Sequence, residues 1–228
     1  MKTIGLIGGM SWKSTMPYYQ IINKTVRDTA GGFHSAKIVL YSVDFAEIEE
    51  LQRAGRWEES GEVLAAIAKT LEQAGADFLV IGTNTMHIVA DQIAAAIGIP
   101  ILHIADPTAE AVLAAGAQTV GLLGTGFTME KEFYRRKLED RGLTVLVPDK
   151  PDRDEVHRVI YDELVLGRIL DESRTTYRRI VRDLAARGAQ AIIFGCTEIG
   201  LLIGQSDSPV PVFDTAVLHA QAAARLAM

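Results

Sequence analysis

Residues 75–84 have the sequence GADFLVIGTN, and residues 188–197 have the sequence GAQAIIFGCT. In each stretch an apolar run ends at a glycine, which is followed by Thr83 in the first copy and by Cys196 in the second. Two further pairs keep nearly the same offset: IGLIG at 4–8 with VGLLG at 120–124, and IPIL at 99–102 with VPVF at 210–213. Internal repetition at a fixed offset predicts two similar structural halves. We expect these halves to face each other across one cleft.

Short apolar runs alternate with longer stretches of helical periodicity, which is typical of βα units on parallel sheets buried on both faces. Strands are predicted at residues 3–7, 37–43, 77–82, 100–103, 119–124, 143–147, 190–195 and 211–213. Helices are predicted at 12–28, 57–74, 85–96, 107–115, 128–141, 152–186 with breaks, and 214–226. The predicted fold class is α/β, with two pseudo-symmetric domains that each contain a mainly parallel sheet flanked by helices. The domains are expected at 1–103, completed by the C-terminal helix 214–228, and at 104–213.

Composition and charge exclude several classes of binding partner. The chain has 228 residues and a net charge of −6, and its basic residues are dispersed, which argues against nucleic-acid binding. No apolar run reaches the roughly 18 residues of a membrane span, and the short apolar start is interpreted as the first strand rather than a signal peptide. A single cysteine cannot form an intrachain disulfide, which favours a reducing, cytoplasmic setting. We expect a small polar or anionic substrate, with no nucleic-acid or membrane partner.

Ligands of open parallel sheets bind beyond the carboxyl ends of the strands, so the residues directly after each apolar run are the candidates for a site. Small polar side chains are concentrated there, and glycine and N-terminal N–H groups of helices can hold a carboxylate. Helix capping is the alternative interpretation of each Ser, Thr or Asn. A nucleotide-phosphate loop at Gly8-Gly9 is disfavoured because neither GxGxxG nor GxxxxGK[ST] is present.

Cys196 and His87 are candidate functional residues beside these strand ends. A lone cysteine is usually an inert apolar residue. Cys196, however, ends a strand, has a polar counterpart in the other half, and is expected to precede a helix N-terminus that would lower its pKa. The histidines show no spacing of metal ligands, so no metal site is predicted. His87 is either a functional group or a residue that packs at the start of a helix.

Six motifs in order resemble the aspartate/glutamate racemase family. They are IGLIGGMSW at 4–12, YSVDF at 41–45, AGAD at 74–77, NTMH at 84–87, GLLGT at 121–125 and GCTEI at 195–199. The resemblance covers essentially the whole chain. Glutamate racemases usually have a histidine after the second Cys-Thr, whereas this chain has Glu198 there, so it resembles the aspartate racemase branch more closely. The resemblance implies an enzyme of the isomerase class that needs no pyridoxal phosphate or other cofactor, and a homodimer. It also implies one cysteine from each domain, flanking the substrate α-carbon.

The chain departs from that pattern at the first cysteine, where it has Thr83. A thiol can be tuned towards neutrality, whereas an alcohol is far too weak an acid to become an alkoxide easily. We therefore expect Cys196 to act as the base, and Thr83 to donate or relay a proton on the opposite face. By the resemblance, proton removal by Cys196 is assigned to the L form. The two residues are expected about 7–9 Å apart on opposite walls of the cleft, which allows two contacts of roughly 3.5 Å to one carbon.

The resemblance also implies the groups that bind the substrate carboxylates. They are the backbone of Met10 and Ser11 and the side chains of Asn84, Thr85, Thr125 and Thr197. Gln52 and Arg53 are the candidates for a further polar or basic contact from the segment after the second strand. A basic contact is also expected near residues 163–168. Leu166 in this stretch is apolar and cannot make the contact, but Arg168 could make it instead.

The predicted function is a cofactor-independent racemase of aspartate, glutamate or a close analogue, with a preference for the L form. One alternative is a decarboxylase or isomerase on the same scaffold, because such a reaction needs only one cysteine. A second alternative is a non-catalytic amino-acid-binding protein. Incorporation of solvent deuterium at the α-carbon discriminates between them.

Overall fold

The computed structural model describes all 228 residues, and the chain divides into two compact units. Unit 1 consists of Met1–Ile104 and His219–Met228, and unit 2 consists of Ala105–Leu218. The sequence predicts a domain boundary between residues 103 and 104, and it assigns the whole helix from residue 214 to the first domain. The structure keeps the start of that helix in unit 2, because Thr215 Oγ1 donates a hydrogen bond to the Phe194 carbonyl at 2.8 Å.

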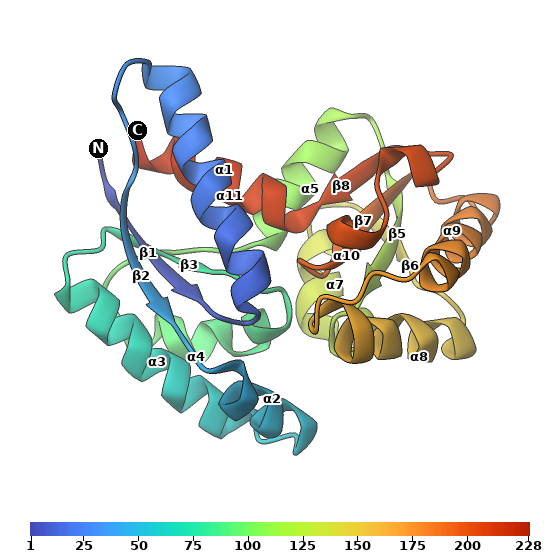
Figure 1. The fold of residues 1–228 in the computed structure, drawn as a ribbon, viewed down its shortest axis with the longest axis horizontal. Coiled ribbons are helices and arrows are strands. Elements are labelled where there is room, and N and C mark those ends of the chain that lie inside the picture. The colour runs from blue at the N-terminus through green and yellow to red at the C-terminus, as the bar shows by residue number, and fades with distance from the viewer. The chain divides into compact units, whose positions relative to one another are not determined.

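Unit 1 contains a four-stranded parallel sheet with the strand order β2-β1-β3-β4. Its strands are β1 (Thr3–Gly8), β2 (Lys37–Ser42), β3 (Phe78–Ile81) and β4 (Ile101–Leu102). Its helices are α1 (Trp12–Ala30), α2 (Phe45–Arg53), α3 (Trp57–Gln73), the 3-10 turn η1 (Thr85–Val89), α4 (Ala90–Ala94) and most of α11 (Thr215–Ala227). Helices α1 and α3 lie on opposite faces of the sheet (Figure 1).

Unit 2 repeats this topology with the order β6-β5-β7-β8, again all parallel. Its strands are β5 (Thr119–Gly124), β6 (Thr144–Leu146), β7 (Ala191–Gly195) and β8 (Val212–Asp214). Its helical elements are α5 (Ala105–Ala114), α6 (Gly126–Glu130), α7 (Glu132–Glu139), α8 (Lys150–Val159), the π-turn η2 (Ile160–Leu164), α9 (Asp171–Ala186), α10 (Ile199–Leu202) and the 3-10 turn η3 (Gln205–Asp207). The predicted α/β class with two similar sheets is confirmed.

Each unit has its own apolar core between sheet and helices. In unit 1, Leu64 and Leu71 of α3 pack with Ile7 of β1 and Leu79 of β3. In unit 2, residues of α8 and α9 such as Val156 and Leu184 pack with β5 and β7. Each fully buried side chain of this size contributes about 1.5–3 kcal/mol relative to exposure. The central strands β1, β3, β5 and β7 are therefore held rigidly, and so are the points at which they end. None of the helices combines the length and the apolar character needed to cross a membrane.

Candidate active site

In unit 2 the candidate site begins where β5 and β7 end side by side. Gly124 and Gly195 are register partners, so Thr125 and Cys196 follow neighbouring strands at the same edge of the sheet. Both positions need glycine, because a Cβ on Gly124 would lie 2.8 Å from the Gly195 carbonyl oxygen and a Cβ on Gly195 would lie 3.0 Å from that of Leu123. The close approach of the two backbones brings the two predicted site residues to one place.

Cys196 is paired with a carboxylate. Its Sγ atom donates a hydrogen bond to Oε2 of Glu198 at 3.1 Å, and Thr197 Oγ1 donates to the same oxygen at 2.7 Å. One oxygen of Glu198 thus accepts both hydrogen bonds. Cys196 is 7% exposed and Glu198 is 2% exposed, so the pair is shielded from bulk water.

The expected lowering of the Cys196 pKa is wrong. Burial raises the pKa of the Cys196 thiol well above its ordinary value, and the negative charges of Glu198 and Asp214 raise it further. The helix that was expected to lower it, α10, has only four residues and begins at Ile199, after Glu198. Desolvation and two carboxylates therefore outweigh the helix N-terminus, and the resting form of Cys196 is the thiol.

Asp214 is a further residue of this site that the sequence did not single out. It ends β8, which pairs with β7, and its Oδ1 atom accepts hydrogen bonds from the N–H groups of Ala216 and Val217 at 2.9 and 3.2 Å. Burial, with the Glu198 charge as a smaller contribution, raises the pKa of Asp214. The signal that could have identified it is its position directly after the VPVF stretch, where each parallel strand should deliver a side chain to the same edge.

Thr125 serves as a helix cap as well. Its Oγ1 atom accepts a hydrogen bond from the Thr128 N–H at 3.3 Å, at the start of α6. Ser11 and Asn84 also stand at N-cap positions, but neither side chain makes a capping hydrogen bond. Capping therefore accounts for Thr125 and not for Ser11 or Asn84.

Unit 1 repeats the arrangement with β1 and β3. Ile7 and Ile81 are register partners, and the Gly82 N–H donates to the Ile7 carbonyl at 2.8 Å. Thr83 consequently follows β3 as Cys196 follows β7, and Met10 and Ser11 follow the neighbouring strand β1. All nine predicted site residues are buried, none more than 9% exposed. They are Met10, Ser11, Gln52, Thr83, Asn84 and Thr85 in unit 1, and Thr125, Cys196 and Thr197 in unit 2.

The two candidates on α2 point in different directions. Gln52 is 3% exposed, and its Nε2 atom donates to the sulfur of Met86, two residues beyond Asn84, at 3.0 Å. The Arg53 side chain is 74% exposed and forms an ion pair with Glu49 at 3.8 Å. Gln52 therefore lies against η1, the turn that contains Met86 and begins at Thr85, whereas Arg53 is directed to solvent.

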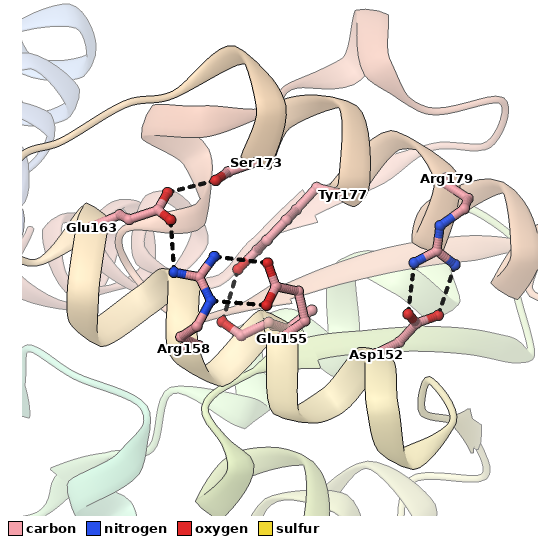
Figure 2. Close-up of polar contacts among 8 residues, drawn as sticks. Asp152, Glu155, Arg158, Glu163, Ser173, Tyr177 and Arg179 are labelled. Carbon is pink, nitrogen blue, oxygen red and sulfur yellow. Dashed lines mark hydrogen bonds and ion pairs between the residues drawn. The ribbon is translucent and has the colours of Figure 1, made fainter.

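The expected basic contact near residues 163–168 is absent from the interior. Leu166 is 57% exposed, and Arg168 is exposed as well. The basic residue at this segment is instead Arg158, which forms an ion pair with the buried Glu163 at 3.0 Å and two hydrogen bonds of 2.8 Å with Glu155 (Figure 2). Ser173 donates to the other oxygen of Glu163. This network fixes the π-turn η2, and no arginine or lysine side chain is buried anywhere in the chain.

The titratable groups do not form a metal centre, since no group of three or more His, Cys, Asp and Glu side chains is arranged to hold a metal ion. The chemistry that the unit 2 residues offer is acid–base chemistry by a buried thiol–carboxylate pair.

Comparisons with known proteins point to one family. The family described as Asp/Glu/Hydantoin racemase matches residues 7–223. Broad specificity amino-acid racemase RacX of Bacillus subtilis (strain 168) is 23% identical over 221 residues, which are 96% of this chain and 95% of that protein.

Solved structures match over the whole chain. A protein from Yersinia pestis proposed to be an Asp/Glu racemase is 55% identical with a TM-score of 0.93, covering 100% of this chain and 99% of that one. An aspartate racemase homologue from Pyrococcus horikoshii OT3 is 36% identical with a TM-score of 0.85 and the same coverage. The predicted resemblance and enzyme class are confirmed, because these homologues are amino-acid racemases, which are isomerases. The chain belongs to the Asp/Glu/Hydantoin racemase family.

Proposed function

We propose that this protein is a cofactor-independent racemase that inverts the α-carbon of an acidic amino acid, aspartate, glutamate or a close analogue, with a preference for the L form. The observation that carries the proposal is the buried Cys196 thiol hydrogen-bonded to the Glu198 carboxylate at the end of β7. An α-proton is very weakly acidic, so its removal needs a strong base held in a site from which water is excluded.

Cys196 is the base. Its proton passes along the existing hydrogen bond to Glu198, so that the S–H bond breaks, an O–H bond forms, and the single negative charge moves from oxygen to sulfur. The thiolate then takes the α-proton of the substrate. The raised pKa of Cys196 makes the thiolate rare but strongly basic, and Glu198 offsets its rarity by accepting the proton at hydrogen-bond distance.

Thr83 is the proton donor or relay on the opposite face of the α-carbon. It stands after β3 at the position that corresponds to Cys196 after β7, which supports a shared role in the two repeats. The hydroxyl gives its proton to the α-carbon and takes a replacement proton that originates from solvent, so no alkoxide is left; the proton held by Cys196 and Glu198 returns to solvent. As a base, the hydroxyl is far weaker than a thiolate. Inversion therefore proceeds between two unequal groups. The proposal requires Thr83 and Cys196 to approach the two faces of one carbon at about 7–9 Å from each other.

Neutral donors hold the substrate carboxylates in this proposal. Asn84, Thr85, Thr125, Thr197 and Gln52 supply side-chain donors, and Met10 and Ser11 supply backbone groups. Because no arginine or lysine is buried, the side-chain carboxylate is not selected by a buried cation, which favours a relaxed choice between aspartate, glutamate and related amino acids. The name of the RacX relative, a broad specificity racemase, agrees with such a choice.

Independence of pyridoxal phosphate is part of the proposal. That cofactor is held as a Schiff base by a lysine in a shielded site, and no lysine of this chain is buried. The family resemblance further implies a homodimer, which sedimentation equilibrium would test, and the single cysteine fits a reducing, cytoplasmic compartment.

The test is incubation of each enantiomer of aspartate and glutamate with the protein in heavy water. We expect deuterium at the α-carbon and formation of the opposite enantiomer, with no added cofactor. Carbon dioxide release or double-bond isomerisation of other substrates, without α-exchange, would favour the single-cysteine alternatives. Stabilisation by an amino acid with no deuterium incorporation would show a binding protein instead.

A further inference from the structure

Three histidines lie together in the interior of unit 1. His87 comes from η1, His103 follows β4, and His219 comes from α11, and none is more than 8% exposed. The His87 ring centroid lies 4.4 Å from that of His103 and 5.9 Å from that of His219. The three side chains are not arranged to hold a metal ion. Their role must therefore follow from the hydrogen bonds that they make.

The partners of His87 assign its tautomer. Its Nδ1 atom lies 2.8 Å from the Thr83 carbonyl oxygen, which can only accept, so Nδ1 carries the proton. Its Nε2 atom accepts a hydrogen bond from the Ile104 N–H at 3.2 Å, so Nε2 carries none. His87 is thus a neutral ring that joins the backbone at the end of β3 to the backbone beyond β4.

The partners of His219 assign the other tautomer. Its Nε2 atom lies 2.8 Å from the Leu102 carbonyl oxygen and therefore donates, and its Nδ1 atom accepts from the Tyr18 hydroxyl at 3.0 Å. The two rings thus hold the segment Leu102–Ile104 at its two ends, His219 at the Leu102 carbonyl and His87 at the Ile104 N–H. Only His87 also holds Thr83.

Burial lowers the pKa of His87 well below its ordinary value, and the neighbouring His103 and His219 lower it further. The ring consequently stays neutral across the physiological pH range, and its donor at Nδ1 and acceptor at Nε2 are permanent. A permanent contact of this kind can set the direction in which the residue after β3 presents its side chain.

We propose that His87 is a positioning residue for Thr83: through its Nδ1–H bond to the Thr83 carbonyl it fixes the backbone from which the Thr83 hydroxyl reaches the substrate. The inference rests on the proposed function, in which Thr83 returns a proton to the face opposite Cys196. A positioning role predicts a specific kinetic defect, because loss of the His87 bond impairs the step at Thr83 and spares the step at Cys196.

Two substitutions separate the two ring nitrogens. In His87→Asn the amide nitrogen is as many bonds from Cα as Nδ1, so the donor to Thr83 can be kept. In His87→Gln the amide group is as many bonds from Cα as Nε2, so the partner of Ile104 can be kept and the donor to Thr83 is lost. His219→Gln is the matched control, because it disturbs the same cluster of three buried histidines, and His219 makes its hydrogen bonds to Leu102 and Tyr18 rather than to Thr83.

The measurement starts from the L enantiomer in heavy water and follows deuterated L, formed by return of the proton at Cys196, and deuterated D, formed by delivery at Thr83. In His87→Gln we expect the ratio of deuterated D to deuterated L to fall about tenfold or more, because small displacements of a reacting group are costly. In His87→Asn and His219→Gln the ratio should stay within about threefold of the unmodified protein, even if thermal unfolding shows lower stability. Equal loss of both products in His87→Gln would overturn the inference and leave His87 a structural residue.

A second readout does not depend on turnover. In ¹⁵N NMR spectra of histidine-labelled protein, His87 should show a protonated Nδ1 and an unprotonated Nε2, with no titration near neutral pH. A protonated Nε2 on His87 would overturn the inference by itself. Absence of deuterium exchange in the unmodified protein would instead overturn the proposed function, and the two failures are thereby distinguished.

Discussion

The Sγ atom of Cys196 donates a 3.1 Å hydrogen bond to Oε2 of Glu198, two residues further along the chain and 2% exposed. The carboxylate has two opposite effects on the thiol. Its charge adds to burial in raising the Cys196 pKa, which disfavours the thiolate. Its oxygen can accept the thiol proton when the thiolate forms. Variants can separate the two effects.

Glu198→Gln should lower the thiol pKa and nevertheless reduce turnover, by about 100-fold, because an amide cannot accept the proton. Asp214→Asn is the matched control. It also removes a charge that raises the Cys196 pKa. The hydrogen bond of the thiol, however, goes to Glu198 and not to Asp214. We expect a lower thiol pKa with most turnover retained. The thiol pKa is measured by the ultraviolet absorbance of the thiolate, and an equal loss of turnover in both variants would contradict a proton-accepting role of Glu198.

Cys196→Ser should abolish α-proton exchange and leave the fold intact. Serine keeps the size of the side chain but has no accessible anion, and loss of a positioned base costs at least about 100-fold in rate. Exchange is measured by mass spectrometry in heavy water, and folding by thermal unfolding. If more than about a tenth of the turnover remained, Cys196 would not be the essential base.

The stability of the protein should fall at alkaline pH because of Cys196. The folded-state pKa of this thiol is raised, mainly by burial, whereas the unfolded chain loses the proton near a pKa of about 8.5. The contribution to stability is therefore complete below about pH 8.5 and is lost as the pH rises towards the folded-state pKa, by up to about 1.4 kcal/mol per pH unit. The measurement is urea unfolding of the unmodified protein and of Cys196→Ser between neutral and alkaline pH. Parallel curves for the two proteins would refute the shift.

The sheets could be predicted from the sequence because buried parallel strands need uninterrupted apolar runs. The stretch 119–124 was predicted as a strand and forms β5 with those limits, and the run predicted at 190–195 forms β7 at Ala191–Gly195. Helix α2 has no range among the predicted helices; it is nine residues long and buries only Ile48 and Gln52. The single helix predicted at 128–141 is two helices that meet at Lys131, whose extended backbone ends α6.

The residues of the candidate site could be predicted where they follow central strands, as Thr83 and Cys196 do. The electrostatics of the site could not. The sign of the Cys196 pKa shift depends on the length of α10, on the rotamer that brings Glu198 to the sulfur, and on Asp214, which β8 delivers from a later part of the sequence. None of these follows from local patterns. The choice between Gln52 and Arg53 likewise depends on which face of α2 packs against the core, and this face is known only from the structure.

The Arg158–Glu163 and Arg179–Asp152 pairs offer a test of burial, because the Glu163 side chain is 8% exposed and that of Asp152 is 24% exposed (Figure 2). Arg158→Ala leaves Glu163, which is 6% exposed, with a buried charge that keeps only part of its partners, and should lower the free energy of unfolding by about 1–3 kcal/mol. Arg179→Ala removes hydrogen bonds of 2.6 and 2.9 Å to Asp152 at the surface, and should cost about 0–1 kcal/mol. Chemical denaturation of both variants gives the two values. Equal costs would show that η2 does not depend on the Arg158 network.

Thr83→Cys should raise exchange from the slow enantiomer. At equilibrium a racemase must give both enantiomers equally, so Thr83 cannot abolish one direction alone; it can make proton exchange unequal. We expect α-deuterium to enter the enantiomer deprotonated by Cys196, assigned to L, faster than its mirror image. A second thiol at residue 83 should increase exchange from D by about tenfold or more, because a thiol forms an anion far more readily than an alcohol. Thr83→Ser, which keeps the hydroxyl, is the control and should give no increase. Initial exchange rates of both enantiomers in heavy water decide the outcome: equal rates in the unmodified protein, together with no gain in Thr83→Cys, would show that another group supplies the second proton.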